Sequence, residues 1–218
     1  MTLRRPRALL FDWDNTLVDT WPAIHHALKA TFLAMGQVPW TYEETQERVR
    51  ASARDTFPEL FGDRADEATE VFYRTYGADH LEKLIERPGA GDAMRALAAQ
   101  ESLYLAVVSN KKGTLLRREA DHLGWTGYFS RLVGALDAAR DKPAPEAVLM
   151  ALEGSNQAPG PDIWFVGDTD IDMVCAVNSG CIPVLVRPNP PVPGEFGDAE
   201  PHAFYPDCAA LLRAVLGM

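Results

Sequence analysis

The chain lacks the features that mark several classes of protein. It has only three cysteines, Cys175, Cys181 and Cys208, and none of them forms a Cys-x-x-Cys unit. This pattern argues against a disulfide framework and a zinc site, so we expect reduced thiols in a cytoplasmic protein. No apolar run reaches the length of a membrane span, and residues 1–7 are too few and too polar for a secretory signal.

The chain also has few basic residues relative to acidic ones. The 21 lysines and arginines are outnumbered by 31 aspartates and glutamates, which leaves a formal net charge of −10. A protein that binds nucleic acid or an anionic membrane needs a basic face, so we expect neither kind of partner. A substrate that carries phosphate would have to meet a few locally placed cations or a metal ion.

What the chain does contain is the pattern of an α/β protein with an insertion. Its 218 residues are enough to bury a full core. Apolar strands alternate with helices after residue 88, which predicts a Rossmann-like parallel sheet covered on both faces. Residues 21–87 show helical periodicity without a strong strand signal. We therefore predict a core domain of residues 1–19 and 88–218, with a small all-helical domain of residues 20–87 inserted after the first strand. The expected core strands are residues 8–11, 103–108, 132–134, 163–166 and 182–186, and the expected core helices are residues 91–100, 112–123, 143–153, 172–178 and 207–216.

Two aspartates emerge together from the first expected strand. Ala8–Phe11 is a short apolar run, and Asp12 and Asp14 follow it. Residues i and i+2 of an extended chain share a face, so the two carboxylates should project together. Two carboxylates at such a short distance repel each other, so their proximity implies a metal ion, a shared proton or both.

Further polar residues follow other expected strands. Ser109 and Asn110 follow one strand, Asp168 and Asp172 follow another, and Lys142 lies in a loop that should reach the same edge. Ligands of open α/β sheets bind outside the carboxyl ends of the strands, so these groups should form one site. Several carboxylates around one hard cation match Mg²⁺, and a carboxylate can also attack phosphorus to form an aspartyl-phosphate.

These residues resemble the haloacid dehalogenase superfamily, in its phosphoglycolate phosphatase-like branch, over nearly the whole chain. Four motifs of that superfamily occur in order, including Asp-x-Asp-x-Thr as the first and Gly-Asp-x-x-x-Asp as the fourth. In this chain the motifs are Asp12-Trp13-Asp14-Asn15-Thr16, Ser109, Lys142 with Pro143, and Gly167-Asp168-Thr169-Asp170-Ile171-Asp172. Any one of them is a weak signal, but the ordered set is specific.

The resemblance implies a chemical role for each motif residue. Asp12 would be the nucleophile that becomes phosphorylated. Asp14 would be the general acid and base, which protonates the leaving alcohol and then activates water. The phosphoryl oxygens would be bound by Ser109, Asn110 and Lys142.

The resemblance also implies a magnesium site. Asp12, the main-chain carbonyl of Asp14, and Asp168 would hold the ion, and Asp172 would support the metal's waters or Lys142. One departure from the family is Asn15, where many relatives carry glycine. Asparagine tolerates the left-handed backbone region, so we expect little harm from it.

The helical insert resembles the family's cap, which closes over small substrates. Trp21 and Arg54 are the candidate specificity residues, since Trp21 could wall the site and Arg54 could meet a second anionic group. Simple packing of Trp21 and a solvent-facing Arg54 remain open alternatives. His25 and His26 lie on the first expected helix of the insert, where a metal or acid/base role is conceivable, but histidines of an amphipathic helix usually pack or face water, and we favour that interpretation.

The sequence thus predicts a magnesium-dependent phosphatase that hydrolyses a small phosphorylated metabolite through an aspartyl-phosphate. A sugar phosphomutase of the same superfamily remains open, because the motifs do not set the lifetime of the aspartyl-phosphate. A non-catalytic phospho-receiver or binding module is the third hypothesis, although receivers carry their acceptor on a later strand and lack this insert. The particular substrate and the oligomeric state, monomer or homodimer, do not follow from the sequence.

Overall fold

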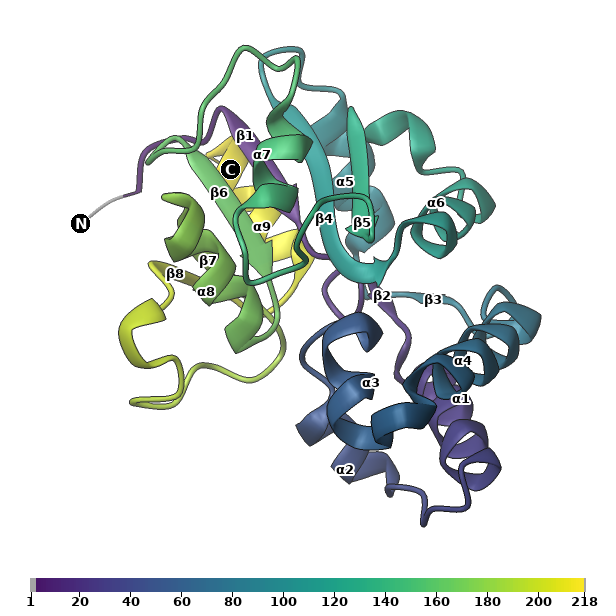
Figure 1. Cartoon of the computed structure of the whole chain (residues 1–218). Helices are drawn as coiled ribbons and strands as arrows, with labels where there is room; N and C mark the ends of the chain where they lie inside the picture. The colour runs from purple at the N-terminus through teal and green to yellow at the C-terminus, as the bar shows by residue number, and fades with distance from the viewer. Residues whose placement is uncertain (1–2, 218) are drawn as a thin grey trace. The chain divides into compact units, whose positions relative to one another are not determined.

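The computed structural model describes residues 3–217, which divide into two compact units (Figure 1). One unit combines the residues up to Val18 with those from Glu86 onward, and the other is Asp19–Ile85. The sequence predicts these divisions after residues 19 and 87.

A six-stranded sheet forms the centre of the first unit, with the strand order β5-β4-β1-β6-β7-β8. All of its neighbouring strands pair in parallel. Because β1 has β4 on one side and β6 on the other, the strand order reverses at β1, where ligands of such sheets bind. The strands are β1 (Ala8–Phe11), β4 (Tyr104–Lys112), β5 (Arg131–Ala135), β6 (Ile163–Gly167), β7 (Ile182–Val186) and β8 (Ala203–Tyr205).

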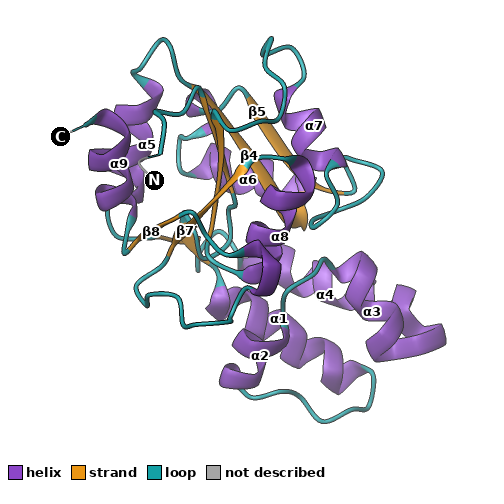
Figure 2. Ribbon diagram, turned by 90° about the vertical axis from the view of Figure 1, so that its left-hand side faces the viewer, coloured by secondary structure: helices purple, strands orange, loops and turns teal. Residues whose placement is uncertain are grey.

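Helices cover both faces of this sheet, as Figure 2 shows. Ala8 and Leu10 of β1 share a core cluster with residues of α7 and α8, such as Val148 and Ala176. Phe11 points to the opposite face, which carries α5, α6 and α9 and where its ring meets Phe129. A strand buried on both faces has no polar side to present, which explains why β1 is apolar throughout. These helices are α5 (Ala90–Ala98), α6 (Gly113–His122), α7 (Glu146–Leu152), α8 (Asp170–Ser179) and α9 (Cys208–Leu216).

The predicted α/β fold is confirmed, but some boundaries of its elements were wrong. β4 does not end before Ser109 but continues to Lys112, because the chain resumes pairing with β5 at Lys112 and Ala135 after a shift of register. This extension keeps Ser109 and Asn110 within the strand.

Other differences arise from proline and from short strands. α7 begins at Glu146 rather than at Pro143, because Pro145 disfavours helical backbone at the residue before it and instead serves as the N-cap. β8 was not predicted because its three half-buried residues carry too little apolar pattern to stand out from a loop.

The second unit is mainly helical. α1 and α4 pack against each other, and α3 packs on α4 through the rings of Phe57 and Phe72, which lie 5.5 Å apart. The chain enters and leaves this unit through the paired strands β2 and β3, which are too short to give a strand signal in the sequence. The elements are β2 (Val18–Asp19), α1 (Trp21–Ala34), α2 (Tyr42–Arg48), α3 (Ala53–Phe61), η1 (Gly62–Arg64), α4 (Ala65–Asp79) and β3 (Ile85–Glu86).

Two expectations from composition can be compared with this fold. All three cysteines are buried and unpaired. Among residues 3–217, none of the helices combines the length and apolarity that crossing a membrane requires.

Candidate active site

The end of β1 brings Asp12 and Asp14 to the carboxyl edge of the sheet. The Asp12 N–H still donates to the Val166 carbonyl of β6, and the chain then turns, with the Asn15 N–H donating to Val18. Asn15 occupies the left-handed region with φ of 64°, which asparagine tolerates. The turn therefore forms in this chain with asparagine at this position.

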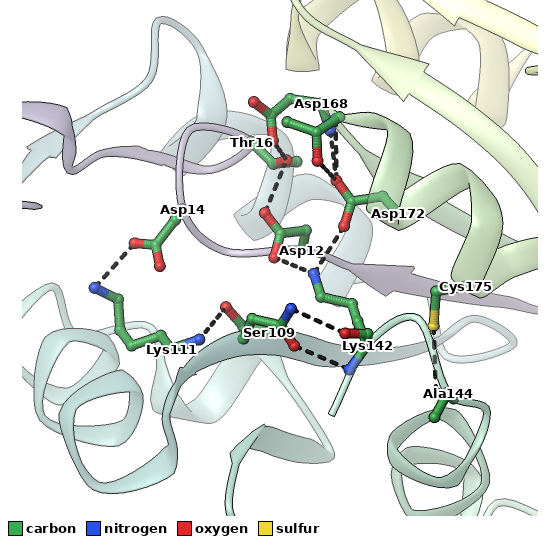
Figure 3. A network of polar contacts seen from close by, with 12 residues as sticks. Asp12, Asp14, Thr16, Ser109, Lys111, Lys142, Ala144, Asp168, Asp172 and Cys175 are labelled. Atoms are coloured by element: carbon green, nitrogen blue, oxygen red, sulfur yellow. Dashed lines mark hydrogen bonds and ion pairs between the residues drawn. The ribbon is translucent and has the colours of Figure 1, made fainter. Parts of the chain in front are cut away.

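Lys142 bridges two of the predicted carboxylates (Figure 3). Its Nζ donates to Asp12 Oδ1 at 2.6 Å and to Asp172 Oδ1 at 2.7 Å, and its side chain is only 2% exposed. Burial alone would lower the pKa of this ammonium, but the charges of Asp12 and Asp172 outweigh that effect and raise its pKa. Lys142 is therefore a fixed positive charge beside Asp12.

Asn110 holds the backbone of Lys142 in place. Its side-chain Oδ1 accepts from the Lys142 N–H at 2.9 Å, and its Nδ2 donates to the Lys142 carbonyl at 3.2 Å. The side chain thus clamps the loop that carries the lysine onto β4. A direct contact of Asn110 with phosphate stays a prediction.

Asp172 has contacts at both carboxylate oxygens. While Oδ1 accepts from Lys142, Oδ2 accepts from the N–H groups of Asp168 and Thr169 and from the Thr169 hydroxyl, at 3.0–3.2 Å. This arrangement needs Gly167, since a Cβ there would lie 2.3 Å from Asp172. Asp172 therefore orients Lys142 and the start of α8, and its predicted part in the metal site stays a prediction.

Asp168 completes a cluster of acidic oxygens. One ligand atom from each of Asp12, Asp168 and Asp172 lies within 4.8 Å of the others. The Thr16 hydroxyl is 3.1 Å from Asp168 Oδ1 and 3.4 Å from Asp12 Oδ2, so it can donate to either carboxylate. Thr16 belongs to the first motif, but the motif alone predicts no contact of its hydroxyl with Asp168.

The acidic cluster carries more negative charge than positive charge. Three carboxylates face the single ammonium of Lys142. Burial, followed by the neighbouring charge of Asp172, raises the pKa of Asp12 to about 7 even though Lys142 opposes the shift. Burial and the charges of Asp172 and Asp12 likewise raise the pKa of Asp168 well above its usual value. A hard divalent cation fits this donor set, since it prefers carboxylate oxygens and would compensate their charge.

Asp14 and Ser109 lie on the other side of Asp12. The Asp14 carboxylate is directed toward Lys111, whose Nζ is 2.9 Å from its Oδ1 (Figure 3). Ser109 Oγ accepts from the Lys111 N–H at 3.2 Å and retains its own hydroxyl proton for donation. The side chain of Lys111 was not predicted as part of the site, although Lys111 directly follows Ser109 and Asn110 in the sequence.

The candidate residues outside this group belong to the second unit. Trp21 is the first residue of α1, and Arg54 is an exposed residue of α3. Within their own unit, His25 Nδ1 is 2.9 Å from the Thr45 hydroxyl and His26 is 3.1 Å from Asp79. Both histidines thus have polar partners inside their own unit, while the specificity roles of Trp21 and Arg54 stay predictions.

The fold and the site together define an α/β enzyme whose polar groups meet at the carboxyl edge of a parallel sheet. Comparison with known proteins then identifies the family. The chain belongs to the haloacid dehalogenase-like hydrolases, whose family model matches residues 9–186.

Individual relatives agree with this assignment. A phosphoglycolate phosphatase of Aquifex aeolicus is 30% identical over 175 residues, which is 80% of this chain and 81% of the relative. The pyrophosphatase PpaX of Listeria monocytogenes is 32% identical over 173 residues, which is 78% of each chain. A haloacid dehalogenase-like hydrolase from Streptococcus pneumoniae shares the fold, with a TM-score of 0.80, 23% identity and coverage of 95% of this chain and 97% of its own.

The predictions of the family, of its fold and of an enzyme of the phosphatase type are confirmed.

Proposed function

We propose that the protein is a magnesium-dependent phosphatase that hydrolyses a small phosphorylated metabolite through a phosphorylated Asp12. The observation that carries this proposal is the pairing of Asp12 with the buried ammonium of Lys142, beside the oxygens of Asp168 and Asp172. Such a site offers a nucleophile, a fixed cation and carboxylates that can bind a metal ion. These groups can lower the high barrier of phosphate ester hydrolysis.

The residues divide the reaction into two displacements. In the first, an Asp12 oxygen attacks phosphorus, and the bond to the leaving oxygen breaks while Asp14 supplies a proton to that oxygen. In the second, a water attacks the phosphorylated Asp12, gives a proton to Asp14 and releases phosphate. Lys142 and the Ser109 hydroxyl hold the phosphoryl oxygens throughout.

Asp12 and Asp168, together with the Asp14 carbonyl, are the groups that would hold Mg²⁺. The ion supplies Lewis-acid stabilisation of the phosphoryl charge when it is bound. Asp172 accepts a hydrogen bond from Lys142 and keeps that lysine directed at Asp12.

The names of the relatives and the helical insert support a substrate class. The relatives named above are called phosphoglycolate phosphatase and pyrophosphatase. Both names refer to substrates that are small anionic phosphate compounds. We extend that class to this chain, with Trp21 and Arg54 as its specificity residues. We also propose a cytoplasmic enzyme that requires neither nucleic acid nor a membrane.

A screen of purified enzyme against several dozen phosphorylated metabolites in magnesium buffer tests this proposal. Release of inorganic phosphate from small anionic substrates is the expected result. Conversion of a hexose 1-phosphate to its isomer without phosphate release would instead indicate a mutase. Absence of turnover on the whole panel would favour a binding module.

Asp168→Asn is expected to weaken Mg²⁺ binding by more than about tenfold, because even supporting residues of a metal site often contribute that much. The measurement is calorimetric titration, backed by the rise of the thermal unfolding midpoint with added Mg²⁺. Asp170→Asn, an exposed aspartate two residues later, is the matched control and should leave the affinity unchanged. Equal affinity of the Asp168→Asn variant and the wild type would remove Asp168 from the metal site.

Protons should compete with Mg²⁺ for the same oxygens. Burial raises the pKa of Asp12 to about 7, so lowering the pH from 8 to 6 adds a proton to a metal ligand. The wild-type Mg²⁺ affinity is therefore expected to fall across that pH range, and an affinity that rises would contradict the assignment.

Arg54→Ala is expected to raise KM for an acidic phosphate substrate more than for a neutral aryl phosphate. The physical reason is loss of the guanidinium that would pair with the second anionic group. Arg74→Ala removes another exposed arginine of the same unit and serves as the control. Equal changes of KM for both substrates would remove Arg54 from the specificity residues.

A further inference from the structure

A second group of charged side chains lies beside Asp14, apart from the acidic cluster. Lys111 Nζ is 2.9 Å from Asp14 Oδ1 and 3.1 Å from Glu119 Oε1, and the Trp13 indole N–H donates to Glu119 Oε2 at 2.7 Å. The side chain of Lys111 is 4% exposed and that of Glu119 is fully buried. Figure 3 shows the Asp14 carboxylate turned toward Lys111, on the side of Asp12 opposite to Lys142.

These contacts form a closed ring. Trp13 is the residue between Asp12 and Asp14, so the backbone from Trp13 to Asp14 is joined back to itself through Lys111 and Glu119. The Trp13 ring is itself fixed, since it packs edge-on against Trp125 at 5.8 Å. Trp13 thus holds Glu119, Glu119 holds Lys111, and Lys111 holds the Asp14 carboxylate.

The burial of Glu119 needs partners, but it does not need Asp14. A buried carboxylate is costly unless it is paired and hydrogen-bonded, and Lys111 and Trp13 supply one partner to each oxygen of Glu119. Lys111 nevertheless also reaches Asp14, which is 20% exposed at the edge of the site. The ion pair therefore connects the interior of the unit to the residue that transfers protons in the proposed function.

The direction of the hydrogen bond distinguishes the two oxygens of Asp14. An ammonium has three donors and no acceptor, so Asp14 Oδ1 must act as an acceptor toward Lys111. We propose that Lys111, anchored by Glu119, is a positioning residue that keeps Oδ1 occupied and presents Oδ2 of Asp14 for proton transfer.

This role rests on the proposed function and enters both of its steps. When Asp12 attacks phosphorus, the electrons of the breaking P–O bond go to the leaving oxygen, which takes the proton from Asp14 Oδ2. When water attacks the phosphorylated Asp12, its proton goes to Oδ2, and the electrons of the breaking bond restore the Asp12 carboxylate. Lys111 keeps its own proton in both steps.

Leaving groups of different basicity separate this role from a structural one. Glycerol 2-phosphate releases a basic alkoxide that needs a proton, whereas 2,4-dinitrophenyl phosphate releases a stable phenolate that needs none. Lys111→Met is expected to lower turnover of glycerol 2-phosphate by about 10- to 100-fold, which reaches only the lower end of the ~10²- to 10⁴-fold contribution of a positioned acid, because Asp14 itself remains. The first turnover of 2,4-dinitrophenyl phosphate should keep its rate, followed by slow steady-state release because the water step still needs Asp14.

A rapid burst of dinitrophenolate from Lys111→Met is therefore the expected signature. Burst and alkyl-phosphate turnover that fall by the same factor would show that the lysine only supports the fold, and unchanged rates for both would show that it does nothing in the reaction. Lys112→Met, the next residue of β4, is the matched control and should behave as the wild type.

If Lys111→Met does not fold, the double variant Lys111→Met/Glu119→Gln removes both charges of the buried pair and is expected to give the same burst. A wild-type enzyme that hydrolyses neither ester would overturn the proposed function itself, whereas a wild type that hydrolyses both makes the Lys111 variants the deciding measurement.

Discussion

Asp12→Asn is expected to lose phosphate release by a factor of about 10⁴ or more, as removal of a catalytic nucleophile does in other enzymes. An amide oxygen is a poor nucleophile and cannot form the aspartyl-phosphate, although it has nearly the same size as the carboxylate. The measurement is phosphate release at saturating substrate and Mg²⁺. Asp198→Asn, an exposed aspartate of the same unit, should retain the wild-type rate. Hydrolysis by Asp12→Asn at the wild-type rate would reject the mechanism.

The same variant is expected to keep its stability, which separates loss of chemistry from loss of fold. The pKa of Asp12 is raised to about 7 by burial, so the stability linked to this group is present below its unfolded pKa and is lost as the pH rises through 7. A neutral asparagine does not incur that loss. Thermal unfolding of Asp12→Asn at pH 8 without metal should therefore occur no lower than that of the wild type.

Lys142→Met is expected to destabilise the first unit by about 3–5 kcal/mol, the usual cost of removing one partner from a buried ion pair. Without the ammonium, the buried carboxylates of Asp12 and Asp172 face each other and Asp168 with no positive charge between them. Urea unfolding, followed by tryptophan fluorescence, measures the loss. Catalysis should be lost as well, because the phosphoryl oxygens lose their fixed cation.

Added Mg²⁺ provides an internal check on this prediction. The ion brings positive charge to the same carboxylates, so it should recover part of the stability that Lys142→Met loses. Lys29→Met, an exposed lysine of α1, is the control and should change the free energy of unfolding by less than about 0.5 kcal/mol. A Lys142→Met protein that is as stable as this control would show that the buried carboxylates do not depend on the lysine.

The specificity residues could not be assigned from motifs. Asp12 and Lys142 could be assigned from the sequence because each belongs to a motif that lies at a predictable strand end or loop. Trp21 and Arg54 belong to the helical insert, whose elements have no such motif. The insert's short helices and its paired strands β2 and β3 were only partly visible in the sequence, since two to nine residues give little periodicity.

The sequence by itself determined the fold class, the buried first strand and the identity of Asp12, Asp14, Lys142 and Asp168 as candidate site residues. These follow from local patterns: an apolar run, polar residues directly after it, and their order along the chain. The positions of such residues at one edge follow from the parallel topology that the alternation of strands and helices predicts.

Only the tertiary structure decided how the side chains are used. Lys142 meets Asp12 across 130 positions of sequence, and Trp13 meets Glu119 across 106, so neither contact has a local signature. The same is true of Asn110, which clamps the lysine loop, and of Lys111, which joins Asp14 to the interior. Which of two available partners a charged group takes depends on packing and burial, and these are properties of the folded chain rather than of any segment.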